Sequence, residues 1–202
     1  MGRKSDARQR ILDAGADLFG KRAYSSIGVA EVCTAAGVPK GSFYYFFPSK
    51  QALALEVVNE HWIWQCGEWN RILTGQGTVV ERLRNLFVTT AEMQSEALKG
   101  TGSVTGCLFG NLALEVSSQD DPVRTRLQEI FQEQIDIVET VIREAVRGGE
   151  LKSTDPRAAA KAIVAQIEGL VLFAKLFNDP GQLEQLWQNS MNLLGSEKFA
   201  AV

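Results

Sequence analysis

Residues 28–50, GVAEVCTAAGVPKGSFYYFFPSK, decide the fold because they place a tight turn between two short helical segments. In the first segment Val29 and Cys33 recur at helical spacing, and Gly37 is free to adopt the positive φ with which helices commonly end. Pro39 then suits the first turn of a second helix, where no backbone N–H is needed. The stretch therefore predicts a helix-turn-helix.

The second helix, expected at roughly 39–46, carries polar and aromatic side chains. It is too short to be stable alone, so it must pack on its neighbours, and we expect Phe43 and Phe47 to face inward. The positions left nearer the surface are Lys40, Gly41, Ser42, Tyr44 and Tyr45. Small residues allow close approach to a DNA groove, while ammonium and hydroxyl groups bond phosphates or base edges. Lys50, at the start of the following helix, adds a charge where the helix dipole also favours a phosphate.

The segment AGVPKGSFYYFFPSKQAL, residues 36–53, resembles the signature of the tetracycline-repressor (TetR) family of one-component transcription regulators. The resemblance covers the N-terminal part from Ile11 to Leu53. It implies that a homodimer binds a double-stranded DNA operator through the residues above and Gly28, and that a small-molecule effector releases the DNA. Gly28, where the family usually has Thr or Ser, offers no hydroxyl, and Phe46, where His or Tyr is usual, cannot hydrogen-bond. We therefore expect the strength or register of binding to differ from the family pattern.

A second interpretation of residues 28–50 is a hydrophobic helical hairpin whose aromatic side chains only fill a core. The charge distribution favours DNA binding instead. Eight basic and four acidic residues through position 50 give +4, whereas 13 basic and 20 acidic residues after it give −7. This asymmetry is expected where one domain meets phosphates and the other does not. The net charge of −3 and a pI near 5.3 for the whole chain conceal it.

The 202 residues, 45% of them hydrophobic, suffice for a DNA-binding domain at 1–48 and an effector-binding and dimerisation domain at 49–202. No apolar run reaches the ~20 residues of a membrane span and the N-terminus lacks an apolar signal core, which favours a cytoplasmic protein. The three cysteines, Cys33, Cys66 and Cys107, lack ligand-like spacing and argue against a disulfide framework or a zinc site. We expect neither a cofactor nor a metal ion.

Beyond Leu53 the pattern predicts an all-α protein, because Gly, Pro and Asp mark helix ends and no segment alternates with period 2. The later helices are expected at 49–73, 78–99, a short stretch from 107, 120–147, 155–178 and from 180 onward. Two of them have broad apolar faces and are candidates for dimerisation, and the resemblance to the TetR family implies that such helices of two subunits pack as a four-helix bundle. These faces comprise Leu127, Ile130, Phe131, Ile135, Val138, Val141, Ile142 and Ala145, and Ile163, Val164, Ile167, Leu170, Val171 and Ala174. The alternative is that both faces are buried within one protomer.

The resemblance also implies a helical body that encloses a small effector, and several aromatic side chains could line such a site. The candidates are Trp62, Phe87, Phe109, Phe131 and Phe173, with Trp64 and Trp69 as further members of the set. Each is individually better explained as ordinary core of a helical bundle. The single histidine, His61, has no second His or Cys nearby, so it is interpreted as a structural or pocket residue rather than a metal ligand.

Cys107 follows Thr105 and Gly106 at an expected helix start, where backbone N–H groups and the helix dipole would stabilise a reactive thiolate. The segment TGCLFGNLALEV, residues 105–116, resembles the stretch around a reactive cysteine in a TetR subgroup that senses electrophiles and oxidants. The resemblance extends to Lys175, whose positive charge would favour the thiolate if the two lie close. The alternative is that Cys107 is a small buried hydrophobe and Lys175 a surface residue.

The sequence thus predicts a TetR-type regulator, most simply a repressor, that binds operator DNA as a dimer and is released by a small hydrophobic or electrophilic effector. Two other classes stay open: a ligand-independent architectural protein that binds DNA through the same domain, and an enzyme with Cys107 as nucleophile and His61 as base. The enzyme has little support, because no group is identifiably placed to orient His61 and the helix-turn-helix would be unexplained. We therefore expect no enzymatic activity.

Overall fold

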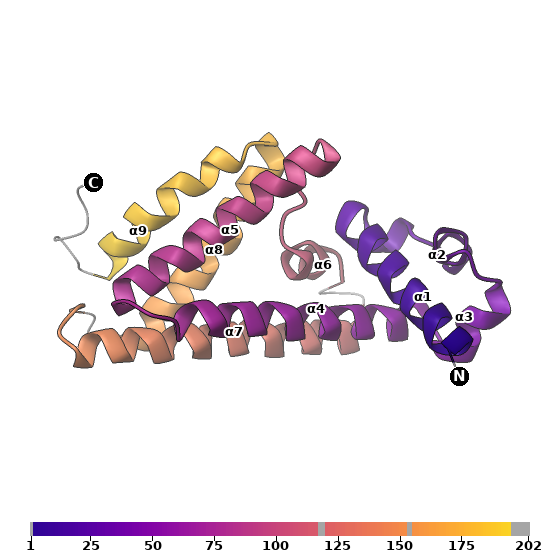
Figure 1. The fold of residues 1–202 in the computed structure, drawn as a ribbon, viewed down its shortest axis with the longest axis horizontal. Coiled ribbons are helices and arrows are strands. Elements are labelled where there is room, and N and C mark those ends of the chain that lie inside the picture. The colour runs from indigo at the N-terminus through magenta and orange to yellow at the C-terminus, as the bar shows by residue number, and fades with distance from the viewer. Residues whose placement is uncertain (1, 117–119, 153–154, 195–202) are drawn as a thin grey trace. The chain divides into compact units, whose positions relative to one another are not determined.

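The computed structural model describes residues 2–116, 120–152 and 155–194, with side chains from residue 6 onward. Within these ranges every regular element is helical, which confirms the all-α prediction. The elements are α1 (Gly2–Lys21), η1 (Tyr24–Ser26), α2 (Val29–Ala36), α3 (Lys40–Phe46), α4 (Lys50–Leu73), α5 (Val79–Thr101), α6 (Leu108–Val116), α7 (Asp121–Arg147), α8 (Pro156–Phe177), η2 (Pro180–Glu184) and α9 (Gln185–Leu193) (Figure 1).

Helix ends fall close to the predicted ones, with two differences. The sequence signals did not predict η1, a single 3₁₀ turn between α1 and α2. The last helix was expected from Pro180, but the chain first forms the 3₁₀ turn η2 there, and α9 begins only at Gln185. Pro180 fits the start of either kind of helix, because it lacks only an N–H that the first turn does not use.

The chain divides into two compact units, which we describe separately. Unit 1 comprises residues 1–64 and 107–128, and unit 2 comprises residues 65–106 and 129–202. Helices α4 and α7 each begin in unit 1 and end in unit 2.

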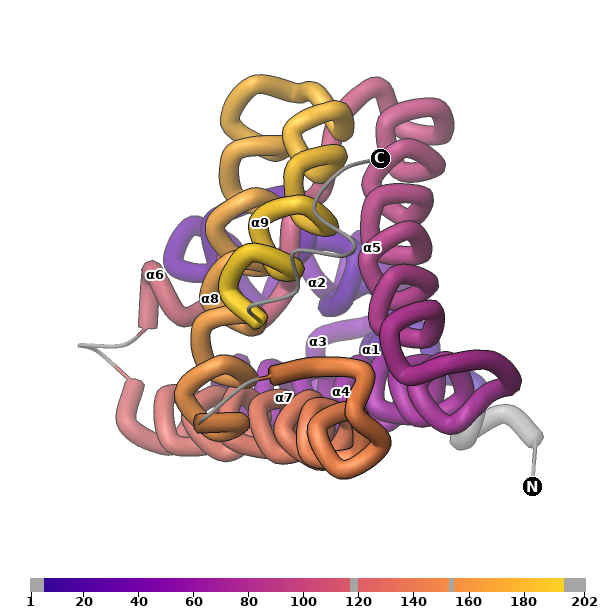
Figure 2. Tube along the Cα trace, turned by 90° about the vertical axis from the view of Figure 1, so that its left-hand side faces the viewer, coloured from indigo at the N-terminus to yellow at the C-terminus, as the bar shows by residue number. Residues whose placement is uncertain are grey.

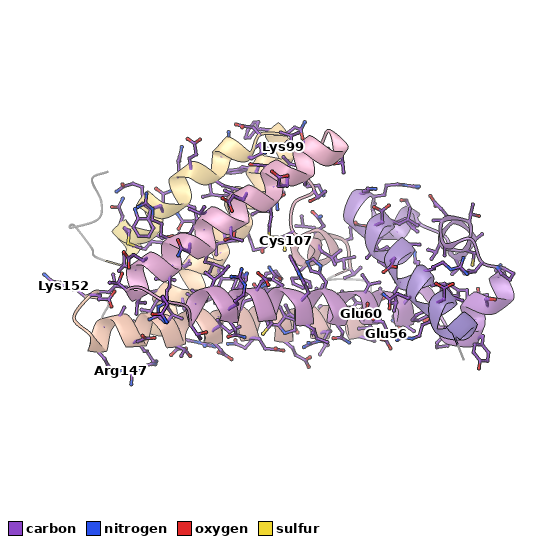
Figure 3. All side chains as sticks on the ribbon, viewed as in Figure 1. Glu56, Glu60, Lys99, Cys107, Arg147 and Lys152 are labelled. Atoms are coloured by element: carbon purple, nitrogen blue, oxygen red, sulfur yellow. The ribbon has the colours of Figure 1, made fainter. Side chains whose placement is uncertain are left out.

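In unit 1, helices α1, α2 and α3 pack on one another, and α6 packs on α1 and η1. The core of the three N-terminal helices includes Ile11, Leu12, Phe19, Val32, Phe43 and Phe47, all at most 2% exposed. Phe43 and Phe47 therefore face inward as predicted. Arg8 of α1 joins α4 through Glu56 and Glu60, at 2.8 and 3.8 Å; Figure 3 labels both carboxylates on α4.

In unit 2, helices α5, α8 and α9 run beside one another, and η2 packs against all three (Figures 1 and 2). Helix α5 begins with a capping box in which Thr78 and Glu81 bond each other's backbone N–H groups, and Asp155 caps α8 through the Ala158 N–H. Arg82, only 7% exposed, bonds the last carbonyl of α4, at Leu73, and the carboxylate of Glu144. These contacts fix α4, α5 and α7 to each other in this unit.

The predicted dimer faces of α7 and α8 are largely buried within the protomer, as the alternative interpretation held. On α8, Ile163, Val164, Ile167, Val171 and Ala174 are at most 4% exposed. On α7, Leu127, Ile130, Val138, Val141, Ile142 and Ala145 are at most 5% exposed, while Phe131, Ile135 and Leu170 are half-buried. Helical periodicity identified buried faces correctly, but it cannot distinguish the core of one protomer from an interface between two.

Candidate nucleic-acid interface and effector site

Helix α3 presents its polar and aromatic side chains outward. Tyr44 is 50% exposed and Tyr45 is 68% exposed, whereas Phe43 on the inner face of the same helix is fully buried. Lys40 and Gly41 are exposed and Ser42 is half-buried. A Cβ added to Gly41 would meet no atom within 4 Å, so the first turn of α3 offers an open surface. The outer face of α3 thus combines a cation, hydroxyl groups and a position without a side chain.

The turn before α3 is built around Gly37, which has φ +62° and ψ +40° in the left-handed region. The Gly37 N–H donates to the Thr34 carbonyl and the Val38 N–H to the Cys33 carbonyl, which is the Schellman arrangement. Arg10 of α1 donates to the carbonyls of Ala36 and Gly37 at 3.1 and 3.3 Å. The end of α2 is therefore bonded both within the motif and to α1, which fixes the direction in which the chain enters α3.

Gly28 lies at the N-cap of α2, with extended backbone angles and an exposed position. It provides no side-chain cap, and the first turn of α2 begins with the Glu31 and Val32 N–H groups on the Gly28 carbonyl. Phe46 is half-buried, with its ring edge-on to Tyr45 at 4.8 Å.

Lys50 lies at the start of α4 as expected, but its ammonium is directed into the protein. It donates to the carbonyls of Tyr24 and Ile27, both at 2.8 Å, and lies 4.2 Å from the centre of the Tyr24 ring. Burial lowers the pKa of Lys50, and the negative charge of Glu115 acts in the opposite direction. An ammonium has three N–H donors, so two carbonyl bonds leave one for a phosphate. The phosphate contact stays a prediction, and the structure adds a second, internal role.

The aromatic candidates for effector binding form separate groups. In unit 1, the rings of Trp62 and Phe109 lie 6.2 Å apart and are 4% and 0% exposed, and His61 lies edge-on to Phe109 at 5.2 Å. Burial lowers the pKa of His61, so this histidine favours the neutral form. The arrangement joins α4 to α6 through an apolar aromatic contact.

In unit 2, Phe87 is 4% exposed and lies edge-on to Trp187 at 6.4 Å, and Phe131 is half-buried. Trp187 of α9 was not among the sequence candidates, although it directly follows the buried Leu186 in the sequence. Phe173, by contrast, is 47% exposed and packs on Phe177 at 6.3 Å. An effector contact at Phe173 stays a prediction, and its exposure is equally suited to an interface.

Cys107 immediately precedes α6, and its carbonyl accepts the Asn111 N–H, so it occupies the capping position of that helix (Figure 3). Its neighbour Gly106 has φ +78°, and the backbone of Gly106 is bonded in both directions by the amide of Gln94. The thiol is half-buried. Lys175 lies in the last turn of α8, in the other unit, and its pairing with Cys107 stays a prediction.

Gln134 of α7 was missed in the sequence, because a single polar residue on a helix is usually surface-exposed. It is only 1% exposed and lies one turn from Ile130 and one turn from Val138, both fully buried. Neither the oxygen nor the nitrogen of its amide has a hydrogen-bond partner among the residues that the structure describes. Such a group is expected to have a partner in the working protein, from water or from a bound molecule.

The order and geometry of these helices agree with comparisons to known proteins. A sequence profile described as bacterial regulatory proteins, tetR family, matches residues 11–57, and one described as tetracyclin repressor-like, C-terminal domain, matches residues 79–189. The chain belongs to the TetR family. It is accordingly a transcriptional regulator of the TetR type, a class in which DNA binding and effector binding are characteristic.

Individual TetR regulators match over most of their length. The transcriptional repressor DhaR of Mycobacterium sp. (strain GP1) is 31% identical over 90% of this chain and 89% of its own. The transcriptional regulator AcuR of Cereibacter sphaeroides is 35% identical over 88% of this chain and 80% of its own. The crystal structure of the reduced form of E. coli NemR superimposes with a TM-score of 0.85 at 26% identity, covering 98% of this chain and 100% of that chain.

No helix in the described ranges is long and apolar enough to cross a membrane. Nor do His, Cys, Asp and Glu side chains of the described residues gather in groups of three or more that could hold a metal ion.

Proposed function

We propose that the chain is a homodimeric repressor that works in the cytoplasm, binds operator DNA through α3, and releases it when a small effector engages the body. The observation that carries the proposal is the outer face of α3, which exposes Lys40, Gly41, Tyr44 and Tyr45 on a helix whose inner face is anchored by Phe43. A recognition helix of this kind enters the major groove and bonds base edges and phosphates. Residues 1–48 then act as the DNA-binding domain, and 49–202 bind the effector and the second protomer.

The second protomer is proposed to cover the exposed apolar side chains of α8. Leu172, Phe173, Leu176 and Phe177 are 45–70% exposed and follow one another at helical spacing. A cluster of this kind on a helix surface marks a protein–protein contact more often than a solvent-facing surface. Sedimentation of Leu176→Glu should show monomers where the wild type shows dimers. A variant that is still dimeric would show that this surface of α8 does not form the dimer interface.

The effector is proposed to be small and largely apolar, with one polar group. The buried aromatic side chains of the body favour an apolar molecule, and the buried amide of Gln134 offers two donors and an acceptor that no described residue bonds. Cys107, capping α6, is proposed to react with electrophiles, with Lys175 as the charge that favours its thiolate. Cys107→Ser should abolish release of DNA by a quinone while leaving DNA binding intact; a retained response would remove Cys107 from the mechanism.

The direct test is footprinting on the DNA upstream of the protein's own gene. A dimer with two α3 helices should protect two segments about one helical turn, ~34 Å, apart. Tyr44→Ala and Tyr45→Ala should lose this pattern, because both remove exposed groups without disturbing the core. Lys161→Ala, an exposed cation on α8, serves as the matched control and should footprint normally. Normal protection by the two tyrosine variants would contradict the assignment of α3.

A further inference from the structure

The turn η1, between α1 and α2, is held through its backbone by two charged side chains from distant helices. Glu115 of α6 accepts the Tyr24 N–H at 3.0 Å, the Ser25 N–H at 3.2 Å and the Ser25 hydroxyl at 3.3 Å. Lys50 of α4 donates to the carbonyls of Tyr24 and Ile27, both at 2.8 Å. Residues 24–27 are therefore bonded by an anion on their N–H side and by a cation on their carbonyl side.

This arrangement specifies one conformation and one position of the turn. A carboxylate can only accept and an ammonium can only donate, so neither side chain fits a turn whose peptide groups are reversed. Hydrogen bonds of this charge-assisted kind are stronger than those between neutral groups. The Tyr24 ring, 9% exposed, also lies against the Lys50 ammonium and edge-on to Phe19 at 5.3 Å. The turn is thus fixed through both its backbone and its side chain.

The turn leads directly into the DNA-binding motif. Ile27, 1% exposed, precedes Gly28 at the N-cap of α2, and α2 is connected to α3 by the bonded turn at Gly37. No flexible segment separates η1 from α2, because Gly28 is both the next residue and the first hydrogen-bond acceptor of that helix. A change in the orientation of η1 must therefore change the direction of α2 or break contacts at its start.

Helix α6 carries Glu115 at one end and follows Cys107 at the other. The intervening helix of nine residues, Leu108–Val116, is continuous, and Cys107 accepts its first backbone hydrogen bond from Asn111. At 1.5 Å per residue, Cys107 and Glu115 are separated by about 12 Å along the axis. Both residues lie in unit 1. A shift of α6 at its Cys107 end is therefore transmitted to the carboxylate that holds the turn.

We propose that Glu115 is a positioning residue for DNA binding: its carboxylate, together with the Lys50 ammonium, holds η1 so that α2 and α3 are oriented for the groove. A displacement of α6 withdraws the carboxylate from the Tyr24 and Ser25 N–H groups and loosens the motif. The inference rests on the proposed function in one respect, namely that α3 binds DNA.

Hydrogen exchange tests the contact itself. Glu115→Gln keeps the size of the side chain but loses the charge and places an amide where only acceptors fit, so exchange at the Tyr24 and Ser25 amides should accelerate by about tenfold to 100-fold. Glu96→Gln, which removes an exposed carboxylate from α5, is the matched control and should leave these amides unchanged. Unchanged exchange in both Glu115→Gln and Glu115→Ala would overturn the proposal.

DNA binding tests the positioning role. Both Glu115 variants should bind the DNA upstream of the gene about tenfold more weakly than the wild type, with a melting temperature within a few degrees of it. Normal affinity despite faster exchange would show that the contact does not position α3 and would overturn the proposal. Failure of the wild type to bind this DNA would instead contradict the proposed function, while the exchange result would still decide whether Glu115 holds the turn.

Coupling to α6 is measured in a Cys33→Ala, Cys66→Ser background, in which Cys107 is the remaining thiol. Modification with N-ethylmaleimide should accelerate exchange at Tyr24 and Ser25 at least threefold, and should add nothing further when Glu115 is already Ala. Acceleration of the same size with and without Glu115 would show that the signal does not pass through the carboxylate and would overturn that part of the proposal.

Discussion

The turns of the DNA-binding motif in unit 1 and the buried amide of Gln134 on α7 in unit 2 differ in how their polar groups are bonded. Around the DNA-binding motif in unit 1, Arg10, Lys50 and Glu115 each bond two or more backbone groups of a turn. In unit 2 the buried side chains of Arg82, Gln94 and Ser190 are hydrogen-bonded, but that of Gln134 has no partner for its amide within the described part of the chain. Hydrogen bonds to the backbone rigidify a turn, whereas a buried amide without a partner can be bonded by a molecule that binds beside it. The comparison indicates that the turns of the DNA-binding motif are fixed by hydrogen bonds, while Gln134 on α7 is one buried group that a bound molecule could satisfy.

The largest expected effect comes from removing the side chain that anchors α3. Phe43→Ala should lower the free energy of unfolding by about 3–5 kcal/mol, because a fully buried aromatic ring leaves a cavity. Tyr45→Ala, on the exposed face of the same helix, should change it by less than about 0.5 kcal/mol. Urea titration monitored by circular dichroism measures both. Equal losses of the free energy of unfolding in the two variants would contradict the assignment of Phe43 to the buried face of α3 and Tyr45 to its exposed face.

A smaller effect of opposite sign is expected in the body. Gln134→Leu should raise the free energy of unfolding by about 1–3 kcal/mol in the absence of effector, because it removes a buried amide without partners. Gln166→Leu is the matched control. Gln166 accepts the hydroxyl of Ser190 at 3.0 Å, and Ser190 is fully buried, so this variant should be destabilised instead. A loss of stability in Gln134→Leu as large as in Gln166→Leu would contradict the view that the amide of Gln134 is unbonded and that of Gln166 is bonded.

The smallest effect is a dependence on pH. Burial lowers the pKa of His61, so the folded protein binds a proton less readily than the unfolded chain. The free energy of unfolding should therefore fall as the pH drops below about 6.5, by at most about 1.4 kcal/mol per pH unit from this residue. His61→Gln should flatten the profile between pH 7 and 5. An identical slope in the variant would assign the dependence to other groups.

The sequence predicted what depends on local pattern. The spacing of Phe43 and Phe47 located the inner face of α3, and Gly37 and Pro39 located the turn, because helix ends and buried faces are determined by neighbouring residues. Helical spacing could not show which apolar faces are covered within one protomer and which stay exposed, as at Leu176 on α8.

What the sequence could not show are contacts between residues distant along the chain. Glu115 lies 90 residues or more from the amides that it bonds, and nothing near it in sequence signals that partner. Lys50 was assigned to phosphate from its place at a helix start, and its bonds to two carbonyls appear only when α4 and η1 are brought together. The buried state of Gln134 was missed for another reason, because a single polar residue on a helix is usually surface-exposed.

The salt dependence of DNA binding tests the central claim, that the outer face of α3 meets the phosphates and bases of a duplex. With DNA from upstream of the gene, the logarithm of the binding constant should fall linearly with the logarithm of salt concentration. Lys40→Ala should reduce that slope by about 2 for a dimer, one lost phosphate contact in each protomer, while Lys161→Ala leaves it unchanged. The same slope for wild type and Lys40→Ala, or a reduced slope for Lys161→Ala, would contradict the account.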